Sequence, residues 1–211
     1  MDPKSQRLPQ AGVAPLEERD PDFLRRLQSR DRDALGRFHD LYFDRIYGYV
    51  RRMVGEDHLA EDVTQDVFMH IQRSIATYDP TRELSPWVFT IATNKVRDHW
   101  RSRRHQDGLR EISFERDDDS GAIDPPDGRA GPLPQLLDGE LRQELDAAIS
   151  GLAEGMREVL VLRWYEELPF DEIGRMIGRN ETAARKRYSR ALAELRVALE
   201  KHVAGRSGGT R

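Results

Sequence analysis

Proline placement constrains this chain more than any other feature. Of its 11 prolines, four fall in residues 1–21 and four lie between Pro125 and Pro134. Proline has no amide donor and breaks helix interiors, so both clusters mark irregular chain. The second cluster belongs to a stretch, residues 105–140, that holds ten acids, three arginines and five glycines. This stretch has too little apolar surface to offset the entropy of ordering, which predicts a flexible acidic linker.

Two small globular pieces are therefore expected. The divisions are a disordered tail over 1–21, a first domain over 22–104, the linker over 105–139, a second domain over 140–203 and a frayed tail over 204–211. No apolar run approaches the roughly 18 residues that span a bilayer, and the N-terminus has no apolar core typical of a secretory signal. These absences predict a cytoplasmic protein with no membrane insertion.

Both pieces show the apolar spacing of helices. In the first, apolar residues recur every three or four positions over 35–53 and again over 59–75, with Gly55 as a stop between the two runs. Ser85 can cap a third helix that has Pro86 at its first position. The second piece has similar stripes, and no Val/Ile/Thr alternation bounded by a tight turn is present. The predicted fold class is all-α.

A segment near the C-terminus has the layout of a helix-turn-helix. A short helix over Asp171–Ile177 should end at Gly178, and Asn180 should then cap a longer helix. The residues expected to pack inward are Ile173, Ile177, Ala184, Tyr188 and Leu192. From Asn180 to Arg196 there are five Lys/Arg against two Glu. We favour DNA binding in the major groove over a structural hairpin with a solvated basic face.

The expected third helix of the first piece combines aromatic and basic side chains. Residues 84–104 hold five Lys/Arg against one Asp. Aromatic rings beside cations suit unstacked single-stranded bases, which need a stacking surface and a counter-charge for phosphate. The aromatic candidates are Trp87, Phe89, His99 and Trp100. The alternative, that the two tryptophans are core residues and the basic end complements the helix dipole, is equally consistent with the sequence.

The net charge of −4 conceals a strongly acidic segment. Residues 55–66 hold five acids and no Lys or Arg. DNA phosphates would repel such a patch, so it indicates a basic protein partner. Capping of a helix N-terminus is the alternative; it accounts for Asp57 and in part for Glu61, and less well for Gln65 and Asp66.

Enzyme chemistry finds no support in the sequence. The chain has no cysteine, which excludes disulfides, thiolate metal sites and a cysteine nucleophile. Its six histidines form no metal-ligand spacing, and there is no nucleophile elbow, P-loop or dinucleotide fingerprint. Glu61 and Asp62 are adjacent and do not face each other on a helix. We expect no catalytic residues, no metal and no cofactor.

Taken in order, these features resemble the bacterial extracytoplasmic-function sigma factors, the smallest group of the housekeeping sigma family. The resemblance covers residues 22–104 and 140–200. Residues 60–68 are similar to the family's helix that docks on the clamp of RNA polymerase. The pattern W-x-x-x-I-A-x-N-x-x-x-D at 87–98 is similar to its promoter-melting helix, which with the preceding loop holds a flipped base. Residues 152–178 look like its minus-thirty-five domain, followed by the recognition helix.

The resemblance implies three groups of site residues. The polymerase-binding group is Glu61, Asp62, Gln65, Asp66 and Phe68. The minus-ten group is Trp87, Thr90, Asn94, Arg97, Asp98 and Arg101. The minus-thirty-five group is Glu181, Thr182, Arg185, Lys186, Ser189 and Arg190. The implied partners are core RNA polymerase, promoter DNA as upstream duplex and as melted single strand at the minus-ten element, and an anti-sigma factor.

Two departures from the family pattern affect the second domain. The family's recognition helix usually opens with Gly-Thr-Val, a basic residue and then often Ser, whereas this chain has Thr182-Ala183-Ala184-Arg185-Lys186. Alanine favours the helix, so the helix should form, and the departure bears instead on the promoter sequence that it reads. Pro169 also stands where the family often has serine.

The implied function is to direct core RNA polymerase to promoters and to melt them, with bond-making left to the polymerase. The main alternative is a helix-turn-helix repressor with an N-terminal sensor domain, which would bind its operator without polymerase. An enzyme with a DNA-binding tail is a third interpretation, and the absence of the catalytic motifs named above disfavours it.

Overall fold

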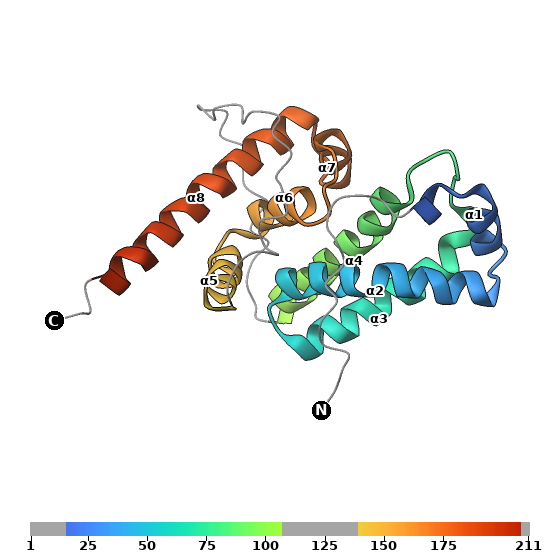
Figure 1. Cartoon of the computed structure of the whole chain (residues 1–211), viewed down its shortest axis with the longest axis horizontal. Helices are drawn as coiled ribbons and strands as arrows, with labels where there is room; N and C mark the ends of the chain where they lie inside the picture. The colour runs from blue at the N-terminus through green and yellow to red at the C-terminus, as the bar shows by residue number, and fades with distance from the viewer. Residues whose placement is uncertain (1–15, 107–138, 208–211) are drawn as a thin grey trace. The chain divides into compact units, whose positions relative to one another are not determined.

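The computed structural model describes residues 16–106 and 139–207, and within them the side chains of 18–103 and 143–200. Every regular element in these ranges is a helix, as the apolar spacing predicts (Figure 1). The chain divides into two compact units, Met1–Arg103 and Arg104–Arg211. Residues 107–138, most of the predicted linker, lie outside the described residues. No described helix is both long enough and apolar enough to cross a membrane.

The first unit is built on three long helices preceded by a short one. Its elements are η1 (Leu16–Arg19), α1 (Pro21–Gln28), α2 (Arg32–Val54), α3 (Asp57–Ser74), η2 (Ile75–Thr77) and α4 (Leu84–Gln106). The predicted stop between α2 and α3 is confirmed: Gly55 adopts φ 84°, and its amide donates to the carbonyl of Arg51. This tight connection lays α3 alongside α2 (Figure 1).

The core of the first unit comes from the predicted stripes together with one face of α4. Tyr42, Ile46 and Tyr49 of α2 are fully buried, as is Val67 of α3. On α4 the buried face is wide and also contains polar groups; Thr93 is 0% exposed and its hydroxyl lies 2.8 Å from that of Tyr49. Pairing the two hydroxyls satisfies both groups within an otherwise apolar interior.

The prediction of a disordered tail over 1–21 is wrong at its C-terminal end. Residues 16–19 form η1, and Asp20 caps α1 by accepting a hydrogen bond from the amide of Asp22 at 2.9 Å, with Pro21 at the first helical position. Glu18 is buried and bonded to side chains of α2 and α4. These long-range bonds order a segment whose composition alone favours disorder.

Ser85 does not cap α4 as the sequence suggested. The helix begins at Leu84, one residue earlier than a Ser85 cap would allow, and Ser85 is buried. Its hydroxyl donates to the carboxylate of Glu18 at 2.9 Å. A tertiary partner has replaced the local backbone partner that serines at helix starts usually take.

The second unit contains α5 (Gly139–Ser150), α6 (Glu154–Trp164), α7 (Phe170–Met176) and α8 (Glu181–Ser207). Its core contains Ile149, Val159, Leu160, Ile173 and Ala184. The helix α8 extends through residues 204–207, the start of the tail that was expected to fray. A lone glycine within a run of good helix formers costs about 1 kcal/mol and does not by itself end a helix.

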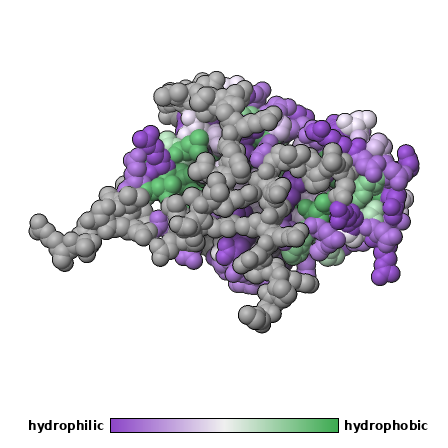
Figure 2. Space-filling model, in the orientation of Figure 1, coloured by the Kyte–Doolittle hydropathy of each residue, from purple (hydrophilic) through white to green (hydrophobic). Residues whose placement is uncertain are grey.

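Outside these cores, the face of the molecule in Figure 2 is mainly hydrophilic where the described residues are coloured, with small hydrophobic patches. Three large apolar side chains of the described residues are exposed: Phe43, Met69 and Val197. Phe43 and Met69 line the same pocket, so exposed apolar surface in the first unit is concentrated in one place.

Candidate functional site

The helix-turn-helix forms as predicted, and a close backbone contact defines it. Gly178 adopts φ 68° after α7, and the side chain of Asn180 caps α8 by accepting from the amide of Ala183 at 2.8 Å. A Cβ added at Gly174 would lie 2.8 Å from the carbonyl carbon of Asn180. Glycine therefore lets the start of α8 lie directly against α7.

The inward-packing stripe of α8 is slightly different from the predicted one. Ala184 and Tyr188 are buried as expected, but Leu192 is only partly buried, and the stripe continues through Ala191 and Leu195. A spacing of 3.6 residues per turn shifts the buried face back by one position over two turns. On α7, Ile173 is fully buried and Ile177 is half-buried.

The side chain of Arg185, in the second turn of α8, contacts two neighbouring side chains. Its Nε and Nη2 both donate to one carboxylate oxygen of Glu181, at 3.0 and 2.7 Å. Its guanidinium also lies 4.8 Å from the ring centre of Phe170, the first residue of α7. The Arg185 side chain is only 23% exposed as a result. We call Phe170, Glu181 and Arg185 the Arg185 clasp.

Phe170 also contacts other side chains of the second unit. The guanidinium of Arg163 lies 4.8 Å from its ring centre, and the ring of Tyr188 meets it edge-on at 5.3 Å. A cation over an aromatic face is attracted by the negative ring quadrupole. The other predicted minus-thirty-five residues share the first turns of α8: Thr182 is exposed, and Lys186, Ser189 and Arg190 are partly buried.

The minus-ten candidates lie along the outward side of α4, although to different depths. Asn94, Asp98 and Arg101 are exposed, and Arg101 pairs with Asp98 at 3.2 Å. Trp87 and Arg97 are half-buried. Thr90 is also half-buried, and its hydroxyl donates to the carbonyl of Pro86 at 2.7 Å.

The structure shows which aromatic residues of α4 belong to the core and which are exposed, a question that the sequence left open. Phe89 and Trp100 are core residues, with exposed fractions of 0% and 7%. Trp87 is half-exposed and contacts the ring of Tyr78, with 5.1 Å between ring centres. Trp87 is therefore the tryptophan of α4 that has surface available to a nucleic-acid base.

The loop before α4 is locally ordered. The Tyr78 hydroxyl donates to the carbonyl of Arg82 at 2.5 Å, and Asp79 accepts from both the amide and the hydroxyl of Thr81, at 3.0 and 2.7 Å. These bonds hold the carboxylate of Asp79 in its charged form and lower its pKa. From α1, Gln28 donates to the carbonyl of Tyr78 at 2.6 Å.

The acidic segment splits into paired and unpaired groups. Asp57 accepts from Arg51 at 2.5 Å, and Glu56 accepts from Arg103 of α4 at 3.1 Å. The unpaired group consists of acids that are exposed and form no ion pair with a described residue: Glu61, Asp62 and Asp66. These three, with Gln65, make up what we call the acidic face of α3. Helix capping does not explain it, because α3 begins at Asp57 and these three acids lie beyond its first turn, where the favourable effect of the helix dipole has fallen off.

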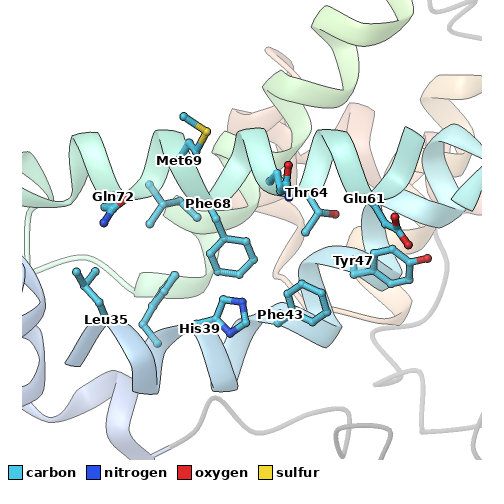
Figure 3. A pocket seen from close by; sticks show the side chains of 12 residues that line it. Leu35, His39, Phe43, Tyr47, Glu61, Thr64, Phe68, Met69 and Gln72 are labelled. Carbon is cyan, nitrogen blue, oxygen red and sulfur yellow. The ribbon is translucent and has the colours of Figure 1, made fainter. Parts of the chain in front are cut away.

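A groove of about 650 Å³ runs beside the acidic face, between α2 and α3 (Figure 3). The imidazole of His39 lies 5.0 Å from the rings of both Phe43 and Phe68, measured between ring centres. Phe43 also stacks on Tyr47 at 6.1 Å. Of the predicted polymerase-binding residues, Glu61, Gln65 and Phe68 line this groove. The buried hydroxyl of Thr64 also lines it and has no hydrogen-bond partner among the described residues.

Two family models match the chain. Sigma-70 region 2 matches residues 38–106, and Sigma-70 region 4 matches residues 148–197. The RNA polymerase sigma factor CarQ of Myxococcus xanthus is 33% identical over 176 residues, which cover 83% of this chain and 95% of CarQ. The chain belongs to the extracytoplasmic-function sigma factors.

As a member of this family, the protein binds core RNA polymerase and directs promoter recognition and melting for transcription initiation. The sigma factor BldN of Streptomyces coelicolor is 30% identical over 82% of this chain and 63% of BldN. SigW of Bacillus subtilis is 27% identical over 83% of this chain and 94% of SigW.

Two solved structures share its fold. CnrH, in complex with the cytosolic domain of CnrY, has a TM-score of 0.62 and 22% identity, covering 88% of this sigma factor and 98% of CnrH. RpoE from Bartonella quintana, in complex with the anti-sigma factor NepR, has a TM-score of 0.60 and 19% identity, covering 78% of this sigma factor and 96% of RpoE.

Sequence reasoning missed the α2 side of the groove. His39, Phe43 and Tyr47 follow one another at spacings of four, so they form a second aromatic row beside the buried stripe of α2. This spacing can be read from the sequence. One apolar stripe is enough to pack a helix against its neighbours, so a second aromatic row beside it indicates a further contact surface. Within the described residues no group of three acids or histidines could hold a metal ion.

Proposed function

We propose that the acidic face of α3 and the adjoining groove together form the docking surface for core RNA polymerase. The single observation that carries this proposal is the coincidence of unpaired acids with exposed aromatic and apolar side chains. Glu61, Asp62 and Asp66 form no ion pair with described residues, and Phe43 and Met69 are 39% and 49% exposed beside them. An apolar centre with a charged rim is the usual composition of a protein interface.

The two parts of this surface contribute differently. The acids steer the encounter with a basic surface of the polymerase. Their attraction to that surface weakens as salt rises, because exposed charges are screened beyond about 10 Å at 0.1 M. The groove contributes through burial of apolar area, which salt does not screen. Thr64 adds a hydroxyl that a polar group of the polymerase can pair with inside the groove.

We propose that α4 and the loop before it capture the melted minus-ten strand. Trp87 supplies a stacking surface, Asn94 an exposed amide for base edges, and Arg101 a cation for phosphate. Stacking offsets the few kcal/mol that unpairing a base costs.

The second unit binds the upstream minus-thirty-five element as duplex, with the Arg185 clasp presenting the guanidinium toward base edges in the major groove.

These assignments divide the tasks between the two units. The first, within residues 22–104, contacts polymerase and melted DNA; the second, within 140–203, anchors upstream duplex. The protein acts in the cytoplasm and forms no covalent bond itself, since its family is not an enzyme family.

An anti-sigma factor is a further proposed partner, as RpoE of the same fold is in complex with NepR. A repressor with a sensor domain is not favoured, because a Sigma-70 region 2 occupies the first unit.

Charge reversal of Asp62 and Asp66 to lysine tests the docking surface. We expect weaker binding to core polymerase, with a loss that shrinks as salt rises and with unchanged helicity. The matched control is Asp22→Lys with Glu194→Lys, which changes the net charge equally at exposed positions outside α3. Phe43→Gln should weaken binding at all salt concentrations. Wild-type affinity of both the double mutant and Phe43→Gln would remove this surface from the polymerase interface.

A further inference from the structure

A buried carboxylate joins the N-terminal turn to two helices of the first unit. The side chain of Glu18, in η1, is 3% exposed and accepts hydrogen bonds from Arg45 of α2 at 3.1 Å and from Ser85 of α4 at 2.9 Å. These partners lie 27 and 67 residues further along the chain. Of the described acids, only Glu18 and Glu158 are buried.

The hydrogen and both lone pairs of the Ser85 hydroxyl take part in hydrogen bonds within this cluster. Ser85 donates its single hydrogen to Glu18, because a carboxylate can only accept. Its two lone pairs then accept from the Tyr42 hydroxyl at 3.0 Å and from Nη2 of Arg45 at 3.2 Å. Burial, followed by the charge of Glu18, raises the pKa of the Tyr42 hydroxyl well above its ordinary value, which keeps Tyr42 a donor.

Arg45 completes the cluster through its guanidinium. It lies 4.9 Å from the ring centre of Tyr42 and 5.3 Å from that of Phe89, which is on α4. The charge of Glu18 is thus compensated by a cation whose side chain is itself only 17% exposed. A buried ion pair often adds little to stability when compared with well-packed apolar groups, and its better-supported role is to specify one arrangement.

The arrangement that Glu18 specifies is the start of α4. Ser85 lies in the first turn of this helix, two positions before Trp87 and in the turn before Thr90. The ring of Trp87 rests on Tyr78, whose carbonyl is held by Gln28 of α1. The minus-ten surface is therefore fixed from two sides, and both supports come from the segment N-terminal to α2.

We propose that Glu18 is a positioning residue for promoter opening: by fixing the first turn of α4, it holds Trp87 and the loop before it ready to receive the melted strand. The inference rests on the proposed assignment of α4 to the minus-ten element. Capture of a flipped base requires a surface ordered before the base arrives, because ordering it during capture would subtract from the binding free energy.

Two variants test this role in the full chain assembled with core polymerase. Glu18→Gln removes the charge and sets an amide donor against the donors of Ser85 or Arg45. Ser85→Ala keeps the ion pair between Glu18 and Arg45 and removes the hydrogen bond from Ser85 of α4 to Glu18, together with the oxygen that accepts from Tyr42 and Arg45. The probe is a single-stranded oligonucleotide that carries the non-template minus-ten strand of a promoter selected with the wild-type holoenzyme. We expect both variants to bind it about tenfold more weakly, the loss that a hydrogen bond to a charged group represents. Their affinities for core polymerase and for the upstream duplex should be unchanged.

The matched control is the double variant Tyr49→Phe with Thr93→Val. It removes the other buried hydroxyl pair between α2 and α4, about two helical turns beyond Ser85. Oligonucleotide binding at the wild-type level by this control, with loss in the two test variants, supports the positioning role. An equal loss in the control would reduce Glu18 to a general structural role and overturn the inference.

Trp87→Ala separates failure of this inference from failure of the minus-ten assignment. Wild-type oligonucleotide binding by Trp87→Ala would overturn the assignment of α4, and the role of Glu18 with it. A loss in Trp87→Ala without a loss in Glu18→Gln and Ser85→Ala would overturn the role of Glu18 alone. Circular dichroism of each variant at the assay temperature confirms that the comparison is between folded proteins.

Discussion

Replacing Arg185 with alanine should relax promoter preference at one base pair of the upstream element. The guanidinium is a planar fork that can donate two hydrogen bonds to O6 and N7 of guanine, and such a pair discriminates by about 1–3 kcal/mol. This range corresponds to a change of about 5- to 150-fold in relative promoter use. Arg185→Lys should lose the same discrimination, because an ammonium group has no planar fork.

The effect of Arg185→Ala on folding should be much smaller than its effect on discrimination. Its pair with Glu181 spans one helical turn and contributes about 0.3–0.5 kcal/mol. Its contact with the ring of Phe170 contributes about 0.5–1 kcal/mol. A combined loss of about 1 kcal/mol leaves the second unit folded, so a change in promoter preference cannot be attributed to unfolding.

The clasp also predicts that Arg185 is ordered before it meets DNA. Fixing a free arginine side chain costs about 1.5–2 kcal/mol of rotamer entropy, and the contacts with Glu181 and Phe170 have already met part of that cost in the free protein. Phe170→Leu should therefore weaken discrimination at the same base pair although Arg185 is still present.

Transcription of a promoter library with each variant holoenzyme measures these effects. Arg190→Ala is the matched control: Arg190 lies further along α8 and should contact phosphate, which carries no sequence information. This variant should weaken all promoters about equally and reduce the salt slope of binding by about one. Equal, sequence-blind losses from Arg185→Ala and Arg190→Ala would show that Arg185 contacts the backbone and that a different face of α8 reads the bases.

Three further predictions concern stability. Asn180→Ala should lower the free energy of unfolding by about 1 kcal/mol through loss of the α8 cap, whereas Asn180→Asp should retain most of it in urea titrations. Gly174→Ala should destabilise by about 1–3 kcal/mol, because the new Cβ meets backbone at 2.8 Å, while Gly36→Ala, with open space around its Cβ, should stabilise by about 0.5–1 kcal/mol. Burial, reinforced by the charge of Glu18, raises the pKa of Tyr78 to about 12; the protonated form is favoured in the folded state, so this stabilisation should be complete below pH 10 and lost toward about pH 12, and Tyr78→Phe should show a flatter alkaline dependence in urea unfolding.

The parts of the fold that follow local rules could be predicted from the sequence. Gly55 and Gly178 stop helices at positive φ, and Asn180 caps α8, because each position depends on its immediate neighbours. The helix-turn-helix and the acidic face of α3 were predicted for the same reason, since both are set by spacing along one or two helices. The roles proposed for their side chains are still predictions.

The parts that depend on distant neighbours could not be predicted. Glu18 contacts Ser85 across 67 residues, so no local pattern indicated that η1 is ordered or that Ser85 would not cap α4. Trp87 and Trp100 lie in one basic helix, and only the packing of α4 decides that Trp100 is buried and Trp87 is not. The groove was missed because it forms between two helices: the second aromatic row of α2 lines it together with Phe68 and Met69 of α3, and the sequence does not show how α3 lies beside that row.

The Arg185 clasp has a consequence for how promoter preference can change over evolution or in the design of independent regulatory circuits. The guanidinium of Arg185 contacts both a carboxylate and an aromatic ring, so replacing Arg185 alone leaves Glu181 without this cation in the first turn of α8. If this turn enters the major groove as proposed, the unpaired carboxylate repels DNA phosphates. Productive changes of base preference should therefore come as coordinated substitutions at 170, 181 and 185. Sigma factors that diverge at one of these positions should diverge at the other two.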